Sequence, residues 1–296
     1  MSAGGRVMTA SSTPAATVPA GPRSRILALA RADARRYARH PLFLLPCAVV
    51  LVAMVAQLVQ RSGGGTDPMV ATLTTAFLLG VFGFVVAHRL TTSLLRSPEL
   101  AGTVPVRRQQ RTMALCLACL VPFAVGVFCA GFMVVTALLW PPDGEPSNLP
   151  VAWFGDYPAT DVVAILLAMG PLATLGGPLL GVAVARWAPF RGSALLGVVV
   201  LVVATAIPAS DGRGSGWRMA SAWPVLVDEH VVDGKIISTT IVPDITPVWA
   251  LGWVTCLCAL AAVAALLRDP EHRRPLLLTG GALAAGAVVC FLLALS

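Results

Sequence analysis

The sequence predicts an all-α, polytopic helical membrane protein, and three observations lead to that fold class. Of the 296 residues, 57% are hydrophobic and only 12% are charged, whereas an ordinary soluble domain is about 25% charged. The mean hydropathy is +0.81. The apolar residues also lie in long blocks, and a helix needs about 20 of them to cross a bilayer. We therefore expect several membrane-spanning helices.

The N-terminal region divides into a tail and an amphipathic segment. Residues 1–22 are rich in Ser, Thr, Ala, Gly and Pro, which predicts a disordered cytoplasmic tail. In 23–41, Ile26, Ala30 and Tyr37 fall on one helical face. The arginines that fall largely on the opposite face are Arg25, Arg31, Arg35, Arg36 and Arg39. We expect an interfacial elbow helix on the inner leaflet, although a plain basic flank is the alternative.

Seven apolar blocks predict the helices of a transmembrane domain that covers 42–295. They lie near 42–60, 69–90, 113–139, 161–185, 193–208, 248–267 and 275–295. The fifth block is short for a membrane-spanning helix. In the fourth, Gly177-Pro178 and Gly181 predict close helix packing or a kink. Between the fifth and sixth blocks, loose alternation around Asp233-Gly234 predicts a small β-hairpin.

The arginines predict the orientation. Segments 1–41, 88–112, 186–192 and 268–274 hold 17 of the 21 basic residues and 4 of the 14 acidic residues. Because basic loops stay in the cytoplasm, we expect a cytoplasmic N-terminus and, after seven spans, an extracellular C-terminus. Tryptophans in or beside the outer loops fit anchoring at the membrane surface. These are Trp140, Trp153, Trp217, Trp223 and Trp249. The Ala-, Val- and Arg-rich composition suggests a bacterial cytoplasmic membrane.

Several classes of chemistry lack their residues in this sequence. No ionisable side chain lies near the centre of a predicted span, which disfavours a proton-coupled transporter. The sequence contains neither HExxH nor GxxxxGK[ST]. The cysteines lie inside apolar blocks, and the histidines lie at span ends or in loops as expected interfacial side chains. We therefore predict no catalytic, cofactor-binding or metal-binding residue, and no nucleic-acid partner.

The segment between the second and third blocks predicts a short helix across the cytoplasmic end of the protein. Ser97-Pro98-Glu99 has the composition of a helix start, with proline first and an acid in the first turn. Gly102 to Pro105 would end that helix. Such an element suits docking of a soluble partner, although a plain basic loop is the alternative.

Together these features resemble the permease subunit of a type-2 ABC exporter, and actinobacterial-type members in particular. In that family the corresponding segment is the coupling helix that sits in a cleft of the partner ATPase. The similarity is carried by Glu99-Leu100, Gly102-Thr103, Pro105 and Arg107-Arg108 in the coupling segment, and by Arg31-Ala32-Asp33 through His40-Pro41-Leu42 in the elbow. The resemblance implies coupling-helix residues Ser97, Pro98, Glu99, Leu100, Gly102, Thr103, Pro105, Arg107 and Arg108. It implies elbow residues Arg31, Arg35, Arg36, Tyr37 and Arg39.

The resemblance also implies the function and its partners. The chain would be the membrane-spanning permease subunit of an ATP-driven exporter and not itself an enzyme. A separate ATPase subunit would bind ATP and Mg²⁺, and a second permease copy or a homologous permease would complete the assembly among membrane lipids. The family core has six spans, so the seventh would be an addition at the C-terminus. The alternatives are a non-transport assembly or anchoring protein, or a secondary transporter of another family.

Overall fold

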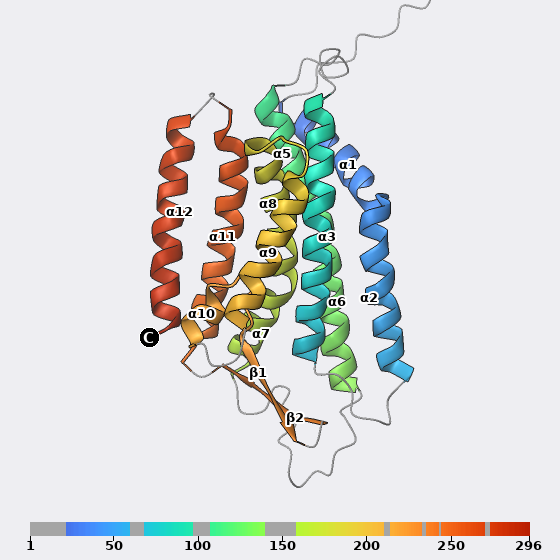
Figure 1. The fold of residues 1–296 in the computed structure, drawn as a ribbon, viewed down its shortest axis with the longest axis vertical. Coiled ribbons are helices and arrows are strands. Elements are labelled where there is room, and N and C mark those ends of the chain that lie inside the picture. The colour runs from blue at the N-terminus through green and yellow to red at the C-terminus, as the bar shows by residue number, and fades with distance from the viewer. Residues whose placement is uncertain are drawn as a thin grey trace, which may run out of the picture.

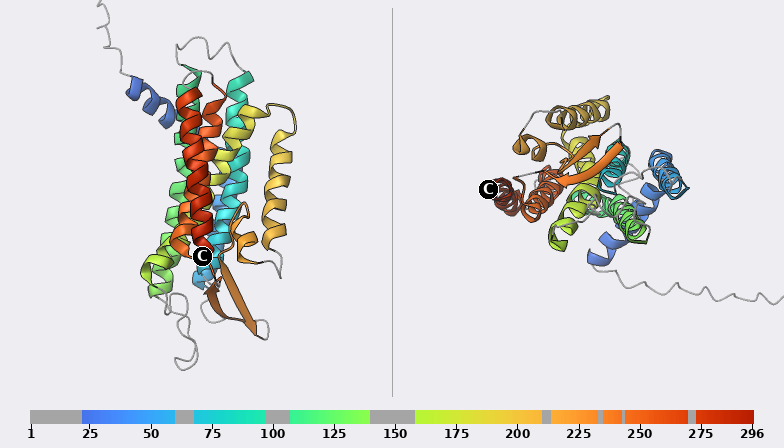
Figure 2. Two further views of the ribbon diagram at one scale, coloured as in Figure 1. Left: turned by 90° about the vertical axis from the view of Figure 1, so that its left-hand side faces the viewer. Right: turned by 90° about the horizontal axis from the view of Figure 1, so that it is seen from below.

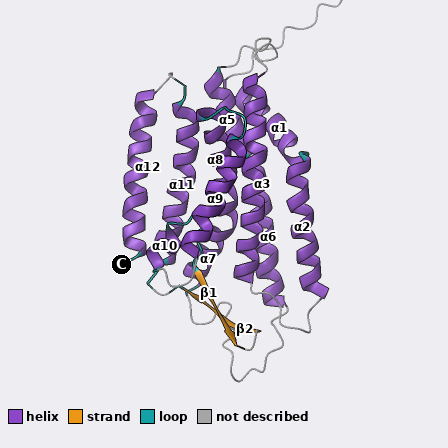
Figure 3. Ribbon diagram, in the orientation of Figure 1, coloured by secondary structure: helices purple, strands orange, loops and turns teal. Residues whose placement is uncertain are grey.

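The computed structural model describes residues 22–59, 68–96, 107–139, 158–209, 214–232, 235–242, 244–269 and 273–296. These residues form a bundle of long helices with a small hairpin at one end (Figure 1). Helix accounts for almost all of the regular structure, as Figure 3 shows. The predicted helical class is therefore confirmed for the described residues, and the hairpin is a small addition to it.

Each of the seven apolar blocks forms a helix or a run of consecutive helices. With α1 and α10, which lie outside those blocks, the helices have the following bounds: α1 Pro22–Ala38, α2 Pro41–Val59, α3 Pro68–Arg96, α5 Arg108–Ala118, α6 Leu120–Leu139, α7 Ala159–Leu167, the π-helical turn η1 Ala168–Leu172, α8 Ala173–Trp187, α9 Ser193–Ala209, α10 Ser215–Met219, α11 Pro247–Leu267 and α12 Arg273–Ala294. Several begin at proline, which suits the first helical position because no hydrogen bond to its nitrogen is needed there.

Among the described residues, five helical stretches are long and apolar enough to cross a membrane. A sixth results if α1 and α2, which meet at a bend of 61°, count as one broken span. The apolar part of α9, Ser193–Ile207, is shorter than the others. By length and composition the chain is thus a multi-pass membrane protein with about five candidate spans.

The predicted hairpin is confirmed. Strand β1 (Val227–Val232) pairs antiparallel with β2 (Lys235–Ile241), with an irregularity in register between His230 and Val231. Asp233 and Gly234, on which the prediction rested, lie outside the described residues.

The helices alternate in direction, so their arginine-bearing ends collect at one end of the bundle. Figure 1 shows the C-terminal ends of α3, α8 and α11 and the N-terminal ends of α5 and α12 together, with the hairpin and the C-terminus opposite. The first of these two ends, which we call the basic end, carries arginines at or near the helix termini. They are Arg89, Arg108, Arg186, Arg268 and Arg273. The alternation of basic and non-basic connections in the sequence therefore corresponds to two opposite ends of the fold.

Helices α3 and α8 lie at the centre, and α12 lies at the edge (Figure 2). The core includes Leu79, Ile165, Met169 and Val182, each at most 1% exposed. Helix α12 packs on α11 and leaves most of its side chains exposed. A largely uncovered apolar helix is expected where the surrounding medium is lipid.

Candidate functional site

Helix α1, the predicted elbow, exposes its arginines, and part of its apolar face is covered by protein. Arg31, Arg35, Arg36 and Arg39 are exposed, whereas Tyr37 is only 1% exposed. The Tyr37 hydroxyl donates a hydrogen bond of 3.0 Å to the carbonyl of Gly83 on α3. Its ring also meets Phe43 edge to face, with centroids 5.0 Å apart. The last turn of α1 is thus tied to α3 and to the start of α2.

Helix α1 packs on α5, the first helix after the segment 97–106. Burial raises the pKa of the Asp33 carboxyl on α1, and the neighbouring guanidiniums of Arg36 and of Arg111 on α5 oppose that rise. Arg107 and Arg108 are exposed where α5 begins. The other implied coupling residues, Ser97, Pro98, Glu99, Leu100, Gly102, Thr103 and Pro105, lie outside the described residues. Helix α1 and α5, which follows the predicted coupling segment, are therefore adjacent at the basic end.

Glycines bring α3 and α8 into backbone contact. A Cβ atom at Gly177 would overlap the carbonyl of Gly80, and one at Gly181 would overlap the carbonyl of Phe84. Residues 177 and 181 are four apart, which is the spacing that lets two membrane helices approach closely. The packing interpretation of these glycines is thus confirmed in the structure. At these positions no side chain separates the backbones of α3 and α8.

The fourth apolar block also contains a π-helical turn. Five residues, Ala168–Leu172, form η1, and Pro171 lies inside it. Proline has no N–H for the helical ladder, and π turns are a recognised way to absorb such an interruption. The Thr174 hydroxyl donates 2.8 Å to the carbonyl of Gly170. The same carbonyl also accepts a hydrogen bond from the Ala173 N–H.

Trp223 stabilises the region beside this turn. We expected it to anchor at the membrane surface, but it is 2% exposed and therefore buried in the bundle. Its indole N–H donates 3.1 Å to the carbonyl of Ala173. The ring fits because Gly80 is opposite: a Cβ there would come within 2.8 Å of the ring. Met219 lies in the same connection between α9 and α11 as Trp223. Its carbonyl accepts a hydrogen bond of 3.1 Å from the indole N–H of Trp253.

A buried ion pair joins α8 to α11 at the basic end. Arg186 and Asp269 approach to 2.5 Å between Nη2 and Oδ1, and their side chains are 8% and 7% exposed. The Arg186 Nε and Asp269 Oδ2 atoms are buried without a hydrogen-bond partner. Next to the pair, the Trp187 indole N–H donates 2.8 Å to the carbonyl of Ala264. Arg268 lies over the Trp187 ring at 5.6 Å from its centroid. We call these contacts the α8–α11 junction.

Sequence reasoning missed this junction. The sequence alone places Arg186 among the cytoplasmic basic residues and Asp269 among the few acids near them. The available signal was Asp269 beside Arg268, one of two acids in a short basic turn, but its partner lies 83 positions away. His88 is a second correction, because it is buried rather than interfacial. Its Nε2 lies 2.8 Å from the Ser193 hydroxyl, where the start of α9 covers it.

No group of three or more His, Cys, Asp and Glu side chains that could hold a metal ion occurs among the described residues. Comparison of the chain with protein-family models, with curated proteins and with solved structures found no match. What this protein does is therefore inferred from the chemistry of its own residues.

Proposed function

We propose that the chain is the membrane-spanning permease subunit of an ATP-driven type-2 ABC exporter in a bacterial cytoplasmic membrane. One observation carries the proposal: helix α1, which resembles the family's elbow, packs on α5, the helix that begins directly after the segment that resembles the coupling helix. An element that receives force from a soluble ATPase must contact the membrane helices. Helix α5 meets this requirement, because it continues into the apolar helix α6 with a break at Cys119.

In this proposal α2, α3, α5–α6, α7–α8, α9 and α11 are the six-span core, and α12 is an added seventh span. The exposed surface of α12 supports its assignment as an addition, because its removal would leave the α3–α8 centre covered as before. The N-terminus is cytoplasmic and the C-terminus extracellular. The ATPase subunit supplies ATP and Mg²⁺ binding, and a second permease, identical or homologous, faces this one across the transport path.

Contacts of described residues offer a route for the mechanical step. Movement of segment 97–106 would shift α5, and α5 would carry α1 with it. The Tyr37–Gly83 hydrogen bond connects α1 to α3, and the contact of Gly177 with α3 passes the movement to α8. Packed helices with two discrete arrangements are the usual carriers of such coupling.

Co-purification tests the proposal. We expect affinity-tagged protein to bring down a P-loop ATPase from its native membrane, and Glu99→Arg to abolish that association, because it reverses the one acidic charge of the coupling segment. Thr160→Arg is the control, since it adds an arginine at an exposed position at the opposite end of the bundle. If no ATPase accompanies the wild-type protein, or if both variants retain it equally, the proposal fails.

A further inference from the structure

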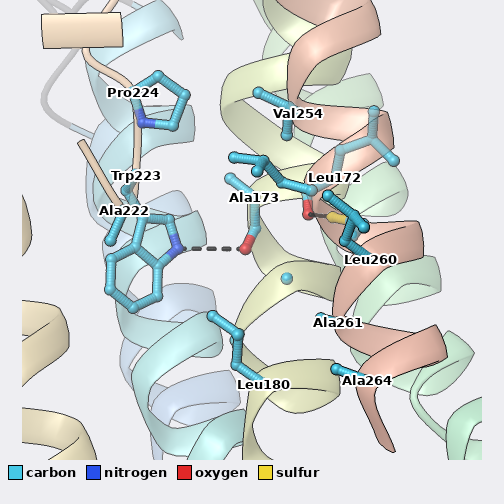
Figure 4. A pocket seen from close by; sticks show the side chains of 14 residues that line it. Leu172, Ala173, Leu180, Ala222, Trp223, Pro224, Val254, Leu260, Ala261 and Ala264 are labelled. Carbon is cyan, nitrogen blue, oxygen red and sulfur yellow. Dashed lines mark hydrogen bonds between the residues drawn. The ribbon is translucent and has the colours of Figure 1, made fainter. Parts of the chain in front are cut away.

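An apolar cavity of about 340 Å³ lies between η1–α8 and α11. Figure 4 shows Trp223 on one side of it and the side chains of α11 on the other. Small residues create the space, because Ala173, Gly176 and Ala261 contribute a methyl group at most. A Cβ atom added at Gly176 would make only ordinary contact, 3.5 Å from the Cys258 sulfur. Protein interiors are otherwise close-packed, so a cavity of this size is a candidate binding site.

The polar groups at the wall of the cavity are already hydrogen-bonded. The Trp223 indole N–H donates to the carbonyl of Ala173 at 3.1 Å, and the Cys258 thiol donates to the carbonyl of Leu172 at 3.4 Å. The lining contains no Asp, Glu, Lys, Arg or His. A polar or charged ligand would lose its hydration here without gaining a partner. The chemistry of the wall therefore selects an apolar ligand.

The rim of the cavity faces outward at the depth of the hydrocarbon. Leu180 and Leu257 line it and are 36% and 37% exposed. They belong to the candidate spans Ala159–Trp187 and Pro247–Leu267, and Leu257 is at the middle of the second. An exposed leucine at the middle of a spanning helix meets lipid or another membrane chain. The abundant apolar molecules at that depth are the acyl chains of lipids.

We infer that this cavity binds one acyl chain of a membrane lipid, which enters sideways between α8 and α11. Ligand cavities usually measure about 300–1,000 Å³, so this one accommodates the end of a chain and not a whole lipid. The headgroup stays at the membrane surface, because the wall offers it no partner. The site requires that the helices cross a bilayer, but it does not depend on the exporter proposal.

Photolabelling of the full-length protein tests the site. The protein is reconstituted in phosphatidylcholine vesicles that contain a phosphatidylcholine with a diazirine near the methyl end of one acyl chain, then irradiated and digested for mass spectrometry. We expect label in peptides that cover 172–180 and 257–264. Gly176→Leu fills the cavity and should reduce that label about ten-fold, since a single methylene in an apolar pocket has an effect of this order.

Gly131→Leu is the matched control, because it makes the same change on α6 at an exposed glycine with nothing within 4 Å. It should leave the labelling of both peptides unchanged. Ala261→Leu fills the cavity from α11 and keeps the test informative if Gly176→Leu does not fold. Label that persists in both filled variants overturns the inference. Equal labelling of the same peptides by a diazirine in the headgroup also overturns it, because the site would then be shallow and polar.

Discussion

Removal of one partner of the Arg186–Asp269 pair should strongly destabilise the protein. Both side chains are less than 10% exposed, so Asp269→Ala leaves a guanidinium buried without its counter-charge. Breaking such a pair from one side costs about 3–5 kcal/mol, which shifts the unfolding equilibrium by roughly two to four orders of magnitude. Arg186→Met should cost a similar amount for the same reason. The measurement is the free energy of unfolding in mixed micelles with increasing dodecyl sulfate.

The double variant Arg186→Met with Asp269→Leu separates the pair's net contribution from the cost of an orphaned charge. It should lower the free energy of unfolding by far less than the sum of the single changes, because no buried charge remains. The pair is also incompletely hydrogen-bonded, since Arg186 Nε and Asp269 Oδ2 have no partner. Arg36→Ala is the control: it breaks the Arg36–Asp33 contact of 3.9 Å, in which Arg36 is 65% exposed, and should cost under about 1 kcal/mol. If Asp269→Ala costs as little as this control, the pair is screened by water and the reasoning is wrong.

Two further predictions concern helix packing. Gly177→Ala should destabilise the protein by about 1–3 kcal/mol, as overpacking does, because the new methyl group overlaps the α3 backbone. Gly131→Ala is the control and should not destabilise it, because there is open space around Gly131. Equal free energies of unfolding for the two variants would contradict the packing of α3 on α8. The thiols of Cys256 on α11 and Cys290 on α12 lie close enough to interact, so copper phenanthroline should oxidise them to a disulfide with the loss of two hydrogens. Peptide mass mapping that finds both thiols unlinked would contradict the docking of α12 on α11.

The helices were predictable because their signal is local. A block of about 20 apolar residues cannot leave its backbone groups unpaired in lipid, and a helix pairs them all within the block. That argument needs no neighbour, and it placed α3, α11 and α12 within a few residues of their observed bounds, apart from the last turns of α3. The glycine pair Gly177 and Gly181 was legible for a related reason, since a four-residue spacing defines one face of one helix.

The candidate site was less predictable because its contacts join distant segments. Trp223 follows a loop rich in small and polar residues, which indicated an anchor at the membrane surface. Its burial depends on a missing side chain at Gly80, 143 positions earlier in the chain. Likewise Arg186 and Asp269 are each an ordinary end-of-helix residue until α8 and α11 are known to be neighbours. Hydropathy gives the order of helices along the chain but not which helices touch.

The arrangement of these distant contacts explains why the cavity persists between α8 and α11. At the basic end, the Arg186–Asp269 pair fixes the distance between the two helices. Towards the opposite end, Trp223, which lies between α9 and α11, donates a hydrogen bond to the carbonyl of Ala173 on α8. Trp253 of α11 donates a hydrogen bond to the carbonyl of Met219, which lies in the same connection as Trp223. The spacing of α8 and α11 is therefore set by the ion pair at one end, by the two tryptophan hydrogen bonds towards the other, and by the hydrogen bond from Cys258 to Leu172 at the cavity wall. These contacts already use the polar groups around the cavity, so the space beside Gly176 and Ala261 need not be filled for the bundle to hold its shape.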